Sequence, residues 1–359
     1  MNAFQFKIFQ EINKSNKGKN IMVSPLSIYH ILSLTTNGAE NKTLKEMLQT
    51  LCHENKAEMN KENKAVSSVI EKFKSIEMAN AVFTRFKPES SFLDMIKEYK
   101  AKLDLLKDAE QVNKWCSDAT HKKIPEIIDS LSENDLMVLI NAIYFKGVWL
   151  KIFEKEKTYL KTFMNFNEKP IETYFMNITE KFDYFENDDI QAISLNYHDD
   201  NMKAFIILPK KEEINLYIKN LTTEKYTEIL KSLENKKVIF SLPKFEIEFG
   251  AELKPNFISL GMIEAFTDSA DFSSMKKENN IKIGRIIHKT FIKVDEEGTE
   301  AAAATAVVMR MKCIRPMNDP IMNVDHPFLF IIRADNLPQG HDILFISKVE
   351  SLKNESNQK

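Results

Sequence analysis

The chain has 359 residues, of which 43% are hydrophobic and 25 are phenylalanine, so it is long enough for one large globular domain or two ordinary ones. Its 50 Lys and Arg residues stand against 52 Asp and Glu residues, with the two signs interspersed. This balance argues against a nucleic acid or an anionic membrane surface as the binding partner.

The cysteines and the N-terminal segment favour a reducing compartment. Cys52, Cys116 and Cys313 are scattered and form neither a disulfide framework nor a metal-binding pair. Lys and Glu interrupt the apolar residues of segment 1–15, and no apolar run of 18 residues occurs. We therefore expect a chain without a conventional secretory signal or membrane span, located in the cytoplasm, with unconventional release to the extracellular space left open.

The first 130 residues have mainly helical patterns. The apolar residues of 4–12 share one helical face. Ser24 followed by Pro25 is a helix start signal, because Ser caps the first turn and Pro fits its first position. A further helical stretch is predicted over 103–131, whereas 49–80 is charged and Met-rich with weak periodicity.

After residue 136 the pattern changes to strands. Short runs rich in β-branched and aromatic residues are typical of strands, and several of these runs are apolar enough to be buried on both faces. They cover 137–150, 203–209, 236–249 and 326–332. The Asn- and Asp-rich segment 187–201 is expected to be a solvated hairpin turn.

The order of the elements predicts the fold class. Helices first and strands later, without a βαβ alternation, predict an α+β fold with largely antiparallel or mixed sheets. No internal repeat, low-complexity linker or boundary rich in Pro, Gly or Ser divides the chain. We therefore expect a single domain over 1–359, and a monomer.

The segment 294–316 has conflicting local signals. Four alanines at 301–304 follow Glu300 and by propensity favour a helix. The segment nevertheless follows a strand-like run, becomes β-branched at Thr305 and Val307, and ends in a polar tail that contains Pro. An ordinary Ala-rich surface helix and a strand are therefore both open interpretations.

If this segment is a strand, one of its faces has only small or β-branched, uncharged residues. Such a chain can slide between two existing strands, because it brings no Pro to interrupt the ladder and no bulky or charged group to bury. Gly298, just before it, permits the sharp backbone change of a hinge. We interpret the segment as exposed in one state and a central strand in another, with this face made of Thr299, Ala301, Ala303, Thr305 and Val307.

The stretch Glu296–Thr305 resembles the hinge of the reactive-centre loop of the serpins, a family of serine protease inhibitors, and in particular of their intracellular-type (ovalbumin-like, clade B) inhibitory branch. Other serpin-like motifs follow in the family's order along nearly the whole chain. Three departures are Lys122, where a glycine is common, Asn196-Tyr197, which lacks the usual Glu-Leu-Pro lead, and Ser347-Lys348, where Gly-Arg is usual. The motifs include VSPLS at 23–27, VNKW at 112–115, NAIYFKGVW at 141–149, SLPKF at 241–245 and DHPFL at 325–329.

The resemblance implies a serpin fold of three β-sheets and eight or nine helices, with an exposed reactive-centre loop at about 294–323. It also implies that a protease attacks the loop as a substrate, forms an acyl-enzyme, and is trapped when the cleaved loop inserts into the central sheet. The chain then supplies no catalytic group and needs no cofactor or metal. The implied hinge consists of Glu297, Gly298, Thr299, Glu300, Ala301, Ala302, Ala303, Ala304 and Thr305.

By the family's count from hinge residue Gly298, the scissile bond is Lys312–Cys313. A Lys there suits a deep pocket with an acid at its base, so the implied target is a trypsin-like serine protease. A register shift of one or two residues brings in Met311, which suits a chymotrypsin-like or cathepsin-G-like pocket, or Arg310, which is again trypsin-like. The alternative is that Arg310 and Lys312 only keep an exposed loop soluble.

The resemblance also implies a buried polar network beneath the point where the central strands part. It consists of Ser24, Asn141 and His288. His288 alone would more often be a satisfied core histidine, and its two partners make it a candidate gate residue.

The sequence lacks the common motifs of an enzyme. The seven histidines form no HExxH motif and no close Cys/His grouping, and no GxGxxG, GxxxxGK[ST] or GxSxG occurs. Two rivals to serine protease inhibition are a non-inhibitory serpin, acting as a chaperone or carrier, and an inhibitor of a cysteine protease. Non-inhibitory members tend to have bulky, charged or Pro residues in the hinge, unlike Thr299 and 301–304 here.

Overall fold

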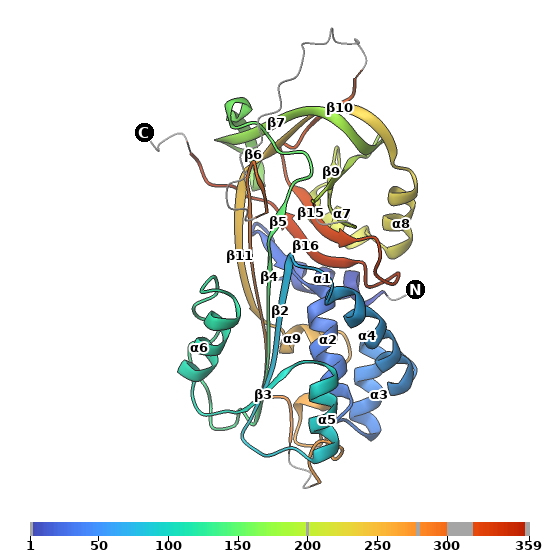
Figure 1. Cartoon of the computed structure of the whole chain (residues 1–359), viewed down its shortest axis with the longest axis vertical. Helices are drawn as coiled ribbons and strands as arrows, with labels where there is room; N and C mark the ends of the chain where they lie inside the picture. Colours follow the sequence, from blue (N-terminus) through green and yellow to red (C-terminus); the bar gives the residue numbers. More distant parts are fainter. Residues whose placement is uncertain (1–2, 199–200, 278–280, 300–318, 356–359) are drawn as a thin grey trace.

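The computed structural model describes residues 3–198, 201–277, 281–299 and 319–355 (Figure 1). Nine α-helices lie within these residues, in agreement with the eight or nine expected, and the strands form two hydrogen-bonded sheets. No helix in this part of the chain has the length and apolar character needed to cross a membrane. The helices are α1 (Phe4–Lys14), α2 (Pro25–Thr36), α3 (Asn41–Thr50), α4 (Lys56–Ile70), α5 (Ser90–Glu98), α6 (Ala109–Ala119), α7 (Ile214–Asn220), α8 (Thr223–Lys231) and α9 (Lys254–Ser259).

Two helices show how far local signals determine the helix ends. α2 begins where the Ser24-Pro25 signal predicts, and the Ser24 hydroxyl accepts a hydrogen bond from the amide two residues after Pro25. The predicted helical stretch 103–131 is too long, since only α6 is helical within it. His121 and Lys122, just after α6, both have positive φ, which a continuing right-handed helix does not allow.

The seven-stranded sheet is the central one. Its strand order is β3-β2-β4-β12, β11 lies on the other edge of β12, and the short strands β13 and β5 extend the sheet at one end. β4 and β12 are parallel neighbours. α6 packs on one face and α2 on the opposite face (Figure 1). The strands are β2 (Ile76–Thr84), β3 (Lys102–Leu105), β4 (Met137–Phe145), β5 (Gly147–Val148), β11 (Phe245–Glu252), β12 (Arg285–Val294) and β13 (Gly298–Thr299).

The nine-stranded sheet has the order β1-β16-β15-β9-β8-β7-β10-β14, with β6 also beside β7. β7 is 18 residues long. It pairs with β6 through its first seven residues and with β8 through its last four. The three expected sheets are therefore the central sheet and two halves of this one, which β7 joins without a break. Its strands are β1 (Ile21–Val23), β6 (Tyr159–Asn165), β7 (Lys169–Glu186), β8 (Ile190–Asn196), β9 (Met202–Pro209), β10 (Glu234–Pro243), β14 (Ile321–Asn323), β15 (Phe328–Ala334) and β16 (Ile343–Val349).

The four predicted apolar runs are strands, and β4 is buried at all nine positions, as expected for a strand covered on both faces. The prediction of a solvated turn over 187–201 is wrong for residues 190–196, and residues 199 and 200 lie outside the described residues. Residues 190–196 form β8, whose first six residues are buried. The Asn and Asp residues lie at the flanks of this short apolar strand, which explains the error.

Candidate functional site

The start of the predicted hinge lies between two strands of the central sheet. β12 ends at Val294, residues 295–297 turn the chain, and β13 runs back antiparallel to β12. On its other edge, β13 pairs antiparallel with β5, which follows almost directly after β4. Gly298 and Thr299 therefore occupy the place from which an additional strand between β4 and β12 would continue.

Main-chain hydrogen bonds hold the turn before β13. The Asp295 amide donates to the Gly298 carbonyl oxygen (2.9 Å), and the Trp149 amide donates to the Glu297 carbonyl oxygen (3.0 Å). The Trp149 indole N–H also donates to the Asp295 carbonyl oxygen at 3.0 Å. Trp149 thus contacts the turn through both its main chain and its side chain.

Two carboxylates add ion pairs to this turn. Glu296 is buried and lies 2.9 Å from the Lys244 ammonium group. Burial raises the pKa of Glu296, but the hydrogen bond from Lys244 and further hydrogen bonds outweigh it, so the pKa lies below its usual value. Glu297 pairs with Lys155 at 2.8 Å, with the Lys155 side chain largely exposed.

Thr299 is fully buried, and its hydroxyl lies 2.7 Å from the Tyr197 hydroxyl. Tyr197 stacks on the Trp149 ring, with ring centroids 4.5 Å apart and planes 13° apart. Burial raises the pKa of Tyr197 far above its usual value, so the hydroxyl stays neutral. The first side chain of the predicted insertion face therefore already points into the core.

Two glycines allow the chains to approach one another closely here. A Cβ atom at Gly298 would overlap the carbonyl oxygen of Gly147, and Gly298 has a positive φ. A Cβ atom at Gly147 would meet the rings of Phe145 and Tyr197 at less than 3 Å. Gly298 is thus required by contact with the neighbouring strand as well as by backbone freedom.

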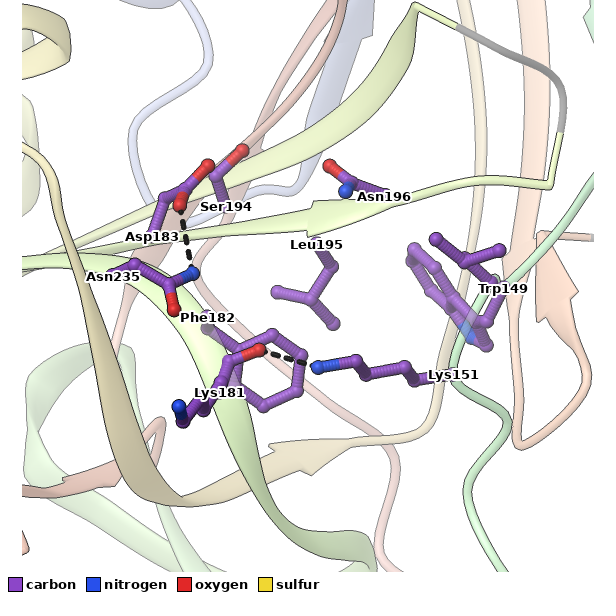
Figure 2. A pocket seen from close by; sticks show the side chains of 10 residues that line it. Trp149, Lys151, Lys181, Phe182, Asp183, Ser194, Leu195, Asn196 and Asn235 are labelled. Carbon is purple, nitrogen blue, oxygen red and sulfur yellow. Dashed lines mark hydrogen bonds between the residues drawn. The ribbon is translucent and has the colours of Figure 1, made fainter.

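Trp149 also lines a small cavity of about 220 Å³ (Figure 2). Leu195 and Phe182 line it, and the Lys151 ammonium group crosses it to donate to the Lys181 carbonyl oxygen at 2.6 Å. Trp149 thus contacts both this cavity and the turn before the hinge.

The predicted gate residues meet between β4 and β12. Asn141 and His288 are directly opposite each other on these strands, with 2.6 Å between Asn141 Oδ1 and His288 Nδ1. The Ser24 amide donates to His288 Nε2 (3.2 Å), so Nδ1 carries the proton and donates to Asn141. Burial lowers the pKa of His288 to about 3, and the ring is therefore neutral at physiological pH.

Two further residues of this network were not predicted. The Asn141 side-chain amide donates to the Ser27 hydroxyl and to Asn80 Oδ1. Ser24 itself contributes its main-chain amide, since its hydroxyl caps α2. Ser27 belongs to the VSPLS motif and was within reach of sequence reasoning, whereas Asn80 lies in β2, a strand that the weak periodicity of 49–80 does not indicate.

The rest of the predicted loop lies outside the described residues. This applies to Glu300, Ala301, Ala302, Ala303, Ala304 and Thr305 of the hinge and to Arg310, Met311, Lys312 and Cys313 around the scissile bond. The described chain resumes before β14, which pairs in parallel with β10. Lys161 donates to the Asn323 side chain in β14 (3.1 Å) and to Ser241 in β10 (2.7 Å). The segment 294–323 is thus anchored in sheets at both ends.

Comparison with known proteins places this geometry in a family. A family model described as Serpin (serine protease inhibitor) matches residues 1–352. Serpin B8 of Homo sapiens is 33% identical over 353 residues, which cover 92% of this chain and 93% of that protein. Leukocyte elastase inhibitor of Xenopus laevis is 34% identical, with 97% of each chain covered. The native structure of the thermophilic serpin tengpin has a TM-score of 0.90 at 30% identity, covering 98% of this chain and 92% of that one. The chain therefore belongs to the serpin family.

Proposed function

We propose that this chain inhibits a serine protease as a suicide substrate, by inserting its cleaved loop between β4 and β12. The observation that carries the proposal is the position of Gly298 and Thr299, which are already antiparallel to both neighbouring strands. If the chain continued in this direction, the new strand would separate the parallel strands β4 and β12 and would pair antiparallel with each of them. Every main-chain group of the new strand would then find a hydrogen-bond partner. The alanines at 301–304 bring no bulk or charge into that space.

The covalent step would take place at the Lys312–Cys313 bond. The protease's serine oxygen attacks the Lys312 carbonyl carbon, the peptide bond breaks, and the amine left on Cys313 takes a proton from the protease's general acid. The serine then holds Lys312 as an ester, which water can hydrolyse. Inhibition requires that the loop inserts faster than this hydrolysis. A trypsin-like enzyme is the first target that we propose, and a cathepsin-G-like enzyme is the target if Met311 is the residue attacked.

Insertion would have to open the gate that now joins β4 to β12. The direct pairing of Asn141 with His288 must separate along with the parallel ladder around it. Thr299 and Val294 pair with each other and are both buried, so they face the same side of the sheet. By the strand period of two, Ala301, Ala303 and Thr305 would follow Thr299 into the core, and Ala302 would face the opposite side.

The first test is the formation of a denaturant-resistant complex. Trypsin or cathepsin G is mixed with the protein, and a covalent adduct is sought on a denaturing gel. We expect an adduct with trypsin, and we expect Lys312→Glu to abolish it. Cleavage of the loop by both proteases without any adduct would contradict inhibition and would favour the non-inhibitory alternative.

A pair of hinge variants tests the insertion step separately. Ala303→Glu would place a carboxylate in the core and should turn the inhibitor into a substrate, with at least a tenfold rise in the molecules consumed per protease trapped. Ala302→Glu adds the same charge on the other face and should inhibit better than Ala303→Glu. Parent-like inhibition by both variants would contradict insertion in this register.

A further inference from the structure

A cluster of titratable side chains that the hinge does not use lies where the turn after α3 meets α4. His53 is in this turn, and Glu58 and Glu62 follow on α4 at a spacing of four, which places them on the same side of the helix. One nitrogen of the His53 imidazole and one carboxylate oxygen of each glutamate lie within 4.8 Å of one another. In the described part of the chain, this is the one group of three or more His, Cys, Asp or Glu ligand atoms that converge in this way.

Further polar side chains hold these groups in place. The Tyr29 hydroxyl lies 2.7 Å from His53 Nε2, and His341 Nε2 lies 2.9 Å from Glu62 Oε2. Both histidine side chains are almost completely buried, at 2% exposure for His53 and 3% for His341. The same Nε2 atom of His53 lies 3.6 Å from Glu62 Oε2, and these bonds hold the imidazole and the carboxylate in fixed orientations.

The cluster is open to solvent on one side. Glu58 is exposed, the Glu62 side chain is 39% exposed, and His53 lines a surface cavity beside α3. Burial lowers the pKa of His53, which keeps its ring neutral at pH 7. The hydrogen bond from His341 lowers the pKa of Glu62, which keeps this carboxylate ionised.

We propose that His53, Glu58 and Glu62 bind a divalent transition-metal ion, with Zn²⁺ as the first candidate. Two carboxylates balance the charge of such an ion, and the imidazole nitrogen favours Zn²⁺ over Ca²⁺ or Mg²⁺, which prefer oxygen ligands alone. The ion would fasten the N-terminal half of α4 to the turn after α3. The sequence predicts no metal site because the spacing of these three residues matches no known motif, and the supporting His341 lies at the other end of the chain.

The test is an isothermal titration calorimetry experiment in which ZnCl₂ is added to the purified full chain, and the heat of binding gives the stoichiometry and the affinity. We expect one ion per chain, with binding weakened at least tenfold in each of His53→Gln, Glu58→Gln and Glu62→Gln. Zn²⁺ should also raise the melting temperature of the parent protein and not that of the variants, since a ligand that binds only the folded state stabilises it.

Two matched controls separate this site from other ligands. His121→Gln removes a histidine that pairs with Glu77 at the surface (2.6 Å), and Cys52→Ser removes the thiol next to His53. Both variants should bind Zn²⁺ as the parent does. Glu58→Gln decides the matter if His53→Gln does not fold, because it leaves the buried contacts of His53 intact. No binding by the parent, parent-like binding by Glu58→Gln, or loss of binding in Cys52→Ser would each overturn the proposal.

Discussion

His288 is a buried imidazole whose hydrogen bonds fix its tautomer. The Ser24 amide donates to one ring nitrogen, and the other donates to Asn141. No acid is among these groups, so burial alone sets the low pKa of the ring. At the residue scale the gate is therefore a neutral network, and it costs free energy to protonate.

This network predicts a dependence of stability on pH. Between pH 6.5 and about 3 the unfolded chain binds a proton at His288 and the folded chain does not, so stability falls as pH falls through this window. The slope contributed by one such group is about 1.4 kcal/mol per pH unit. We expect His288→Gln to flatten the melting temperature against pH between 4 and 6, measured by scanning calorimetry.

His326 provides a control, because its pKa is shifted in the direction opposite to that of His288. Burial lowers its pKa, but the hydrogen bond with Asp325 outweighs this, and the pKa in the folded chain is raised. Its stabilisation is present below pH 6.5 and is lost as pH rises through the raised pKa. His326→Gln should therefore leave the slope between pH 4 and 6 almost unchanged and reduce the loss of stability above pH 6.5. An identical slope in the parent and in His288→Gln would contradict a neutral buried gate.

A second prediction at this scale concerns Gly298. Gly298→Ala would place a Cβ atom against the Gly147 carbonyl oxygen and should expel β13 from the sheet. Hydrogen exchange of the Asp295 amide, which donates to Gly298, should then accelerate about tenfold or more. Gly250→Ala is the matched control, because a Cβ there meets only the Lys289 side chain at ordinary distances. Unchanged exchange in Gly298→Ala would contradict the docked hinge.

At the scale of elements, the apolar and β-branched runs predicted the central strands, and the Ser24-Pro25 cap predicted the start of α2. β7 was missed because its charged residues alternate irregularly with its apolar ones, so that neither face gives a clean period of two. β2 was missed because its first residues belong to the charged, weakly periodic segment 49–80. The gate could therefore be predicted only in part, because Asn80 lies on one of these missed strands.

Besides its main-chain pairing with β10, the strand β14 is linked to the sheet by Lys161 of β6. Lys161 donates to side chains of β7, β10 and β14 and lies over the rings of Tyr159 and Phe175. Its loss would weaken the attachment of the C-terminal end of the loop segment, which would then depend on the pairing of β14 with β10. We expect Lys161→Met to lose inhibitory capacity on warming about tenfold faster than the parent, because the uncut loop can then enter the sheet.

The measurement is titration of the remaining inhibitor with trypsin at intervals during incubation. Lys151→Met is the control, because Lys151 also donates to a carbonyl oxygen and lies over an aromatic ring, that of Phe182. It should lose capacity at the rate of the parent. Equal rates for Lys161→Met and Lys151→Met would show that β14 is not held in this way.

At the scale of the whole molecule, the motifs predicted the family and its α+β fold. They did not predict that Gly298 and Thr299 are docked in it, because small residues suit both an exposed loop and a buried strand. The choice depends on contacts with Tyr197 and Gly147, which come from other elements. The central claim is therefore that the intact molecule contains a parallel β4–β12 pair with space for one more strand.

The melting temperature before and after loop cleavage tests this claim most directly. A metalloprotease is suitable for the cleavage, because it forms no acyl-enzyme and leaves the cut chain free. A new central strand adds backbone hydrogen bonds on both edges, and each stabilises the fold by about 1 kcal/mol. Each kcal/mol of added stability raises the melting temperature of a large domain by roughly 2–4 °C. We expect cleavage to raise the melting temperature by about 20 °C or more. A cleaved protein that melts within about 2 °C of the intact one would contradict insertion.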